Sequence, residues 1–181
     1  MREFIYPEMM VHVPVCTNKV PEKVLIISDN AELLSAEMSK HNDIGSSVIG
    51  ANLDAIRDEE DNSADVVICE MGADAAVIGH ISRILKDDGQ LSITHSSLDE
   101  TKENKILLQV LGKYFKIIMP YNLGNGSTAL LASKEYHPTA DIILQRSDMI
   151  DGLEYYNCDI HIAAFAMPNY IRKEYLGIIR N

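Results

Sequence analysis

The feature that most constrains the fold is an alternation of short apolar runs with longer amphipathic segments. Val24–Ile27 and the end of Asp65–Cys69 are runs of consecutive apolar residues, which is typical of strands buried on both faces of a parallel sheet. Ala75–Leu85 and Thr101–Leu111 instead carry apolar residues at helical spacing. Strands that alternate with helices predict an open, mostly parallel α/β sheet with right-handed crossovers.

The last two predicted strands are joined only by a short turn containing Gly124 and Gly126, so they should pair antiparallel. An antiparallel hairpin at the end of a parallel sheet is the layout of the class-I methyltransferase-like (Rossmann-like) fold. The other predicted elements are helices over Glu8–Val13 and Ala31–His41, strands over Ser47–Gly50, Gln90–Thr94, Phe115–Met119 and Ala129–Ala132, a charged loop over Arg57–Asn62, and a helix end at Asp87–Gly89.

Composition excludes several classes of function. The 27 acidic and 16 basic residues give a net charge of −11 with no basic run, so we expect no nucleic-acid partner. The acidity would suit a cationic substrate, although the charge alone is better explained by solubility. Cys16, Cys69 and Cys158 show no metal-ligand spacing and predict reduced thiols and no metal site. No apolar run approaches the ~20 residues of a membrane span and no signal peptide opens the chain, so we expect a cytoplasmic protein.

Ligands of open α/β sheets bind at the carboxyl ends of the strands, and acidic and amide side chains follow three of the predicted strands. Asp29 could bind a cationic amine or ribose hydroxyls, or simply cap the next helix. Glu70 with Asp74 could deprotonate an amine nucleophile, although spacing alone slightly favours surface acids that cap a helix. Asn52 and Asp54 could bind hydroxyl groups, but ordinary loop polarity explains them equally well.

Near the C-terminus, Tyr155–Pro168 closely resembles the ending of spermidine synthases, a family of polyamine aminopropyltransferases. The likeness is collinear over nearly the whole chain, so we interpret residues 1–181 as a single spermidine synthase-like domain. Within it, residues 1–20 form an N-terminal helix and linker, and residues 150–175 form a C-terminal packing helix. The other segments that resemble family motifs are Phe4–Pro14, Lys23–Ile27, Asp65–Glu70, Leu85–Gly89 and Ala132–Pro138.

The resemblance implies binding of decarboxylated S-adenosylmethionine as co-substrate, with no permanently bound cofactor, and transfer of its aminopropyl group to putrescine or a related amine. It implies that Glu70 is the catalytic base and that Tyr6 and Asp74 bind the amine. Asp29, with Asn52 and Asp54, would lie on the side of the adenosyl group. A homodimer is also expected, because a chain without the family's extra domain would expose apolar surface that a second copy could cover.

The chain differs from the family pattern at several places. Pro7 replaces the histidine after Tyr6, and the second acid of the family's D-x-x-D pair is Ala73 by strict spacing, with Asp74 one place later. Ser28–Glu32 stands where the family has its GGGDGG loop, and only about a dozen residues separate Ile49 from Asp65, too few for the usual helix, strand and helix. We therefore expect a shortened, divergent member that lacks one strand and the family's N-terminal β-domain. The alternative function is a non-catalytic relative that binds a polyamine or nucleoside, or that serves as a subunit of an assembly.

Overall fold

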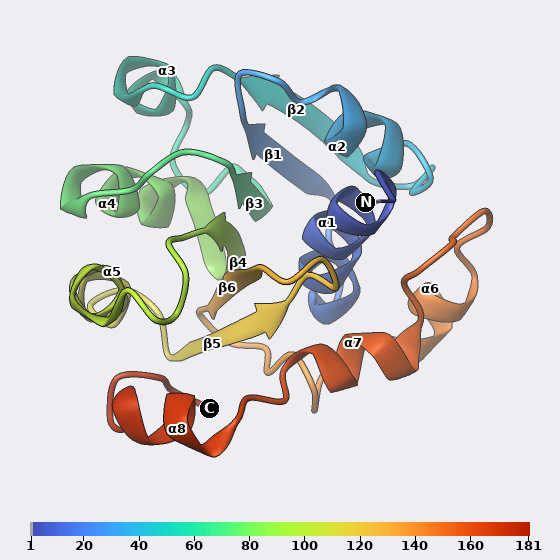
Figure 1. The fold of residues 1–181 in the computed structure, drawn as a ribbon. Coiled ribbons are helices and arrows are strands. Elements are labelled where there is room, and N and C mark those ends of the chain that lie inside the picture. Colours follow the sequence, from blue (N-terminus) through green and yellow to red (C-terminus); the bar gives the residue numbers. More distant parts are fainter. Residues whose placement is uncertain (1) are drawn as a thin grey trace.

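The computed structural model describes residues 2–181 and contains one six-stranded sheet with strand order β2-β1-β3-β4-β6-β5 (Figure 1). The strands β1 to β4 run parallel, whereas β6 pairs antiparallel with both β4 and β5. The predicted parallel sheet with an antiparallel hairpin is confirmed. The strands are β1 Lys23–Ile27, β2 Gly45–Ile49, β3 Ala64–Cys69, β4 Leu85–Thr94, β5 Ile117–Asn122 and β6 Thr128–Ser133.

Helices cover both faces of the sheet and create two apolar cores. One core packs α3 Leu53–Asp58, α4 Ala75–Ile84, α5 Thr101–Leu111 and α8 Asn169–Glu174 on one face. The other packs α1 Ile5–Thr17, α2 Glu32–Met38 and α7 Cys158–Ala164 on the opposite face, with α6 Leu144–Asp148 against α1 and α7 (Figure 1). Because β1 and β3 contribute alternate side chains to each core, their sequences show apolar runs without alternation.

The helix α1 is the most buried helix, and every residue from Pro7 to Thr17 is buried. It is longer at both ends than the predicted Glu8–Val13. The buried Glu8 carboxylate accepts hydrogen bonds from the backbone N–H groups of Glu154, Tyr155 and Tyr156 at 2.7–2.9 Å. These hydrogen bonds attach α1 to the start of the C-terminal segment Tyr155–Pro168.

Three expectations about local structure need correction. The segment from Arg57 is not wholly a loop, because the Asn52 side chain caps α3 through the N–H of Ala55 and the helix continues to Asp58. Asp87–Gly89 does not end a helix; α4 ends at Ile84 and these residues lie in β4, beside a shift in its register with β3. The C-terminal segment forms α7 and α8 with a break between them rather than one helix.

The short connection between β2 and β3 holds only the six-residue helix α3. Among the described residues no further strand lies between β2 and β3. Among residues 2–181, no helix is both long and apolar enough to cross a bilayer.

Candidate active site

Glu70 is the centre of a hydrogen-bonded group at the carboxyl ends of β1 and β3. Its Oε1 accepts a hydrogen bond from the Tyr6 hydroxyl at 2.6 Å, and its Oε2 accepts one from the Ser28 hydroxyl. The register of the sheet explains the meeting, because Ile27 pairs with Cys69 and the next residue on each strand is Ser28 or Glu70. Tyr6 reaches the same carboxylate from α1, which lies on one face of the sheet.

Burial controls the protonation of the side chains around Glu70. Burial, followed by the hydrogen bond to Glu70, raises the pKa of the Tyr6 hydroxyl well above its usual value. The phenol is therefore a neutral donor at physiological pH. Burial also raises the pKa of the neighbouring Cys69 thiol to about 12, which excludes a thiolate nucleophile there. Glu70 is thus the residue of this group whose chemistry fits proton transfer.

Asp29 and Asn52 lie together beside Gly50, at the ends of β1 and β2. Asp29 Oδ1 accepts the backbone N–H of Ala51 at 2.9 Å. A Cβ added to Gly50 would lie 2.9 Å from Asn52 Nδ2 and 3.7 Å from Asp29 Oδ1, so both side chains lie next to this glycine. Asp29 keeps acceptor capacity beyond its bond to Ala51 and is exposed, which suits ribose hydroxyls.

The other two acidic candidates have local structural roles. Asp74 caps α4, since its Oδ1 accepts from the N–H groups of Ala76 and Val77 at 2.9 and 3.0 Å. The Asp54 side chain is 91% exposed on α3 and contacts Arg57 at 3.4 Å. Neither is hydrogen-bonded to Tyr6 or Glu70. The structure therefore brings Tyr6 to Glu70 and Asn52 to Asp29, and leaves Asp74 and Asp54 outside both groups.

Two polar residues at the same edge of the sheet were missed by sequence reasoning. Ser28 reads as a turn residue, and only the register between β1 and β3 reveals its bond to Glu70. His95 directly follows β4, and no spacing to another candidate residue marks it in the sequence. Its Nδ1 lies 2.8 Å from Asn104 Oδ1 and its Nε2 lies 3.0 Å from Thr128 Oγ1. Burial lowers the pKa of His95 despite the opposing bond to Asn104, and the neutral ring is a fixed part of this edge.

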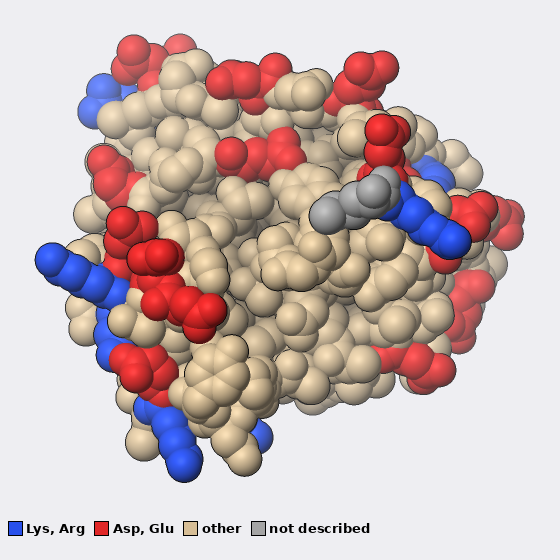
Figure 2. All heavy atoms as spheres, in the orientation of Figure 1, with Lys and Arg blue, Asp and Glu red and all other residues tan. Residues whose placement is uncertain are grey.

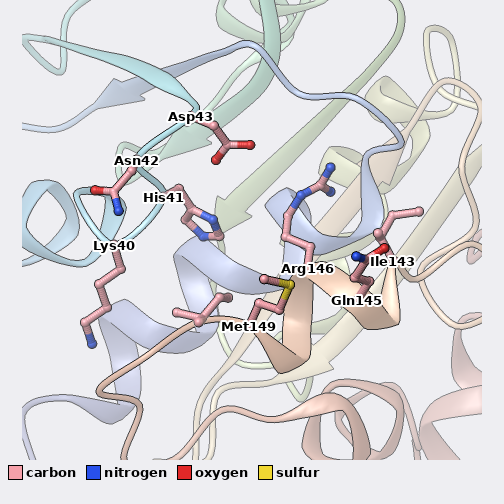
Figure 3. A pocket seen from close by; sticks show the side chains of 9 residues that line it. Lys40, His41, Asn42, Asp43, Ile143, Gln145, Arg146 and Met149 are labelled. Atoms are coloured by element: carbon pink, nitrogen blue, oxygen red, sulfur yellow. The ribbon is translucent and has the colours of Figure 1, made fainter.

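A hollow of about 450 Å³ lies elsewhere, between the end of α2 and α6 (Figure 3). In Figure 3, Lys40, His41 and Asp43 line one side, and Arg146 and Met149 line the other. Most of its polar groups already serve the fold. Arg146 donates to the carbonyls of Val15, Asn18 and Lys19, Lys40 pairs with Glu37, and His41 Nε2 lies 2.9 Å from His12 Nδ1.

Two further hollows flank α8. The smaller, of about 340 Å³, includes His95 and Thr128 in its wall. The larger, of about 510 Å³, lies along β5 and contains Met119 and Phe165. Glu70, Tyr6 and Asp29 line none of these three hollows.

The charge distribution favours a cationic ligand over an anionic one. Figure 2 shows more acidic than basic groups on the face presented, most of both kinds around a centre without charged side chains. Within residues 2–181, no three His, Cys, Asp or Glu side chains are grouped so that they could hold a metal ion. The chemistry available at this edge is therefore that of a carboxylate held by two hydroxyls, beside a second carboxylate at the β1–β2 end.

Comparisons with known proteins point to one family. The family described as the spermine/spermidine synthase domain matches residues 3–86. A polyamine aminopropyltransferase of Helicobacter acinonychis is 32% identical over 114 residues, which cover 60% of this chain and 44% of that protein. The polyamine aminopropyltransferase of Thermotoga maritima is 28% identical over an alignment of 227 positions, gaps included, which covers 98% of this chain and 76% of that protein.

Solved structures give the same result at the level of the fold. Spermidine synthase from Thermotoga maritima matches with a TM-score of 0.82 and 25% identity, over 95% of this chain and 74% of that one. A spermidine synthase in complex with the transition-state analogue AdoDATO matches with a TM-score of 0.84 and 23% identity, over 95% and 75% of the two chains. The chain spans about half the length of the Helicobacter relatives that it matches.

Proposed function

We propose that this chain, which belongs to the spermine/spermidine synthase family, transfers an aminopropyl group from decarboxylated S-adenosylmethionine to putrescine or a related amine. In this reaction the amine nitrogen attacks the aminopropyl carbon bonded to the sulfonium sulfur. The C–S bond breaks, its electron pair stays on sulfur, and the new C–N bond forms. The nitrogen must lose a proton to the enzyme or to water.

The observation that carries the proposal is the carboxylate of Glu70 at the end of β3, held by the Tyr6 hydroxyl at 2.6 Å. A held carboxylate stabilises the positive charge of an incoming amine and can accept its proton. Because the phenol of Tyr6 is kept neutral by a raised pKa, it donates to Glu70 without competing for the amine's proton. We assign Glu70 as the catalytic base and Tyr6 as part of the amine site.

We assign the adenosyl side of the co-substrate to the ends of β1 and β2. The free acceptor capacity of the Asp29 carboxylate suits ribose hydroxyls, and Asn52 lies beside it around Gly50. Asp54 is kept as a more distant contributor on α3, and Asp74 as a fixed negative charge that helps to attract the cationic amine. The net charge of −11 acts in the same direction.

Within the same proposal the ligands are small molecules, decarboxylated S-adenosylmethionine enters as co-substrate rather than as a bound cofactor, and the protein acts in the cytoplasm. The exposed apolar side chains of Leu176, Met149 and Tyr170, at 83%, 73% and 63% exposure, are consistent with a homodimer. Nucleic acids and membranes are not partners in this account.

The test is an assay of the purified chain with decarboxylated S-adenosylmethionine and a panel of diamines of increasing length, with products identified by mass spectrometry. The proposal predicts an aminopropylated amine with at least one acceptor, and its loss in Glu70→Gln. Glu60→Gln is the matched control, because Glu60 is an exposed acid in the loop after α3. A folded wild-type chain that yields no product with any diamine would instead support the non-catalytic alternative.

A further inference from the structure

Ser28 carries a role that the family resemblance does not supply. Its side chain is almost fully buried, at 6% exposure, although serine at a strand end ordinarily faces solvent. Its hydroxyl makes two contacts, one with the Glu70 carboxylate and one with the backbone N–H of Asn30 at 3.0 Å. Because one partner of this hydroxyl is a carboxylate and the other is a backbone N–H, only one of the two can receive its proton.

The direction follows from the inventory of donors. An ionised carboxylate only accepts hydrogen bonds, and a backbone N–H only donates. The Ser28 hydroxyl must therefore accept from Asn30 and donate its single proton to Glu70 Oε2. Tyr6 donates to the other oxygen. With one donor on each oxygen, the carboxylate is fixed in both position and plane.

The two donors are anchored independently. Tyr6 belongs to α1, whereas Ser28 is held by the backbone of β1 and β2, because its own N–H donates to the carbonyl of Ile49 at 3.1 Å. Glu70 is in turn held by its N–H, which donates to the carbonyl of Ile27 at 2.9 Å. Loss of the Ser28 hydroxyl would leave Oε2 without this donor and free the carboxylate to rotate about the Tyr6 contact.

From this geometry we infer that Ser28 is a positioning residue for the proposed reaction: its hydroxyl aims the Glu70 carboxylate toward the amine. The expected effect on kcat rests on the proposed function, whereas the orientation of the Glu70 carboxylate by Ser28 does not depend on any reaction. Ser28 itself does not touch the reacting atoms in this account. Its effect is on the fraction of molecules in which Glu70 is correctly oriented.

Steady-state kinetics of Ser28→Ala test the functional part. Removing a hydrogen bond to a charged group should lower kcat about tenfold to a hundredfold, while KM for decarboxylated S-adenosylmethionine stays close to the wild-type value. Ser28→Thr, which keeps the hydroxyl, should restore most of kcat. Ser46→Ala, a change at an exposed serine of β2, should leave both constants unchanged. Wild-type kcat in Ser28→Ala would overturn the inference, and so would failure of threonine to rescue a well-folded variant.

Crystal structures of the wild type and Ser28→Ala test the geometric part without any activity. The inference predicts that Glu70 keeps its contact with Tyr6 but adopts a different or mixed carboxylate orientation in the alanine variant. An unchanged Glu70 side chain would contradict it. If the wild type makes no product but Glu70 reorients in Ser28→Ala, the positioning role stands and the proposed reaction fails, so the two failures are distinguishable.

Discussion

At the scale of single residues, the site depends on which side chains stand directly after a strand. Glu70 could be predicted from sequence because it follows the apolar run of β3. Its partner Ser28 could not, because a serine before Asp29 and Asn30 reads as a turn. Asn52 and Asp74 each cap a helix. For Asp74, capping is the alternative that the spacing slightly favoured, and the ligand-binding roles of both residues stay predictions. Residue type at a strand end indicates an available group, and only the register indicates its partner.

Tyr6→Phe tests the second donor to Glu70. The change removes the 2.6 Å bond to Oε1 and little else, so we expect kcat to fall about tenfold. The free energy of unfolding should change by less than about 1 kcal/mol, because the ring keeps its packing. Activity assays and urea unfolding of the same sample separate the two effects. Wild-type turnover in the phenylalanine variant would show that the phenol does not support the reaction.

At the scale of elements, the strands and helices predicted best were those whose burial pattern is the same from end to end. The strand β3 has six buried residues in succession, and α5 matches its prediction at both ends, Thr101 and Leu111. The short helix α3 was missed because only Ile56 is fully buried in it, so no apolar stripe marks it. The helix expected over residues 150–175 is interrupted after Ala164, and Pro168, in an extended conformation, is the N-cap of α8.

The attachment of α1 to the segment before α7 gives a prediction about stability. Glu8→Gln leaves one oxygen for three backbone N–H donors and turns an amide donor toward them. We expect a loss of about 1–3 kcal/mol in the free energy of unfolding, measured by urea denaturation. Glu3→Gln, at an exposed position near the chain start, is the control and should change stability by less than about 0.5 kcal/mol. Equal stability of the two variants would show that the buried carboxylate contributes nothing specific.

At the scale of the whole molecule, the alternation of strands and helices was sufficient to predict the sheet and its antiparallel hairpin. Sequence spacing between Ile49 and Asp65 also predicted the shortened middle, which the structure fills with α3 alone. The positions of the hollows could not be predicted, because they depend on how loops after several strands pack together. The three described hollows lie away from Glu70, and no sequence pattern indicated this.

Stability should depend on pH through two buried histidines. His161 accepts from the Tyr156 hydroxyl and donates to the carbonyl of Pro138, and burial lowers the pKa of His161 and of His41 to about 4 each. In the unfolded chain both titrate near 6.5. Above that pH both are neutral in either state and stability is full. Between about pH 6.5 and 4 the unfolded chain binds protons that the folded chain does not, so stability falls as pH falls.

Each histidine should contribute a slope of up to about 1.4 kcal/mol per pH unit in this window. Urea unfolding between pH 8 and pH 4 measures the slope. His161→Gln should be less stable at neutral pH but should show a shallower dependence, because one of the two proton-binding groups is gone. A free energy of unfolding that stays constant from pH 7 to pH 5 would contradict the protonation states assigned here.

The most direct measurement of the central claim is simultaneous quantification of both products of transfer. Decarboxylated S-adenosylmethionine and a diamine should yield the aminopropylated amine and methylthioadenosine in equal amounts, because each transfer breaks one C–S bond and forms one C–N bond. The account predicts this equality in the wild type and in Glu60→Gln, and neither product above background in Glu70→Gln. Methylthioadenosine without aminopropylated amine, or equal products in Glu70→Gln, would contradict the account.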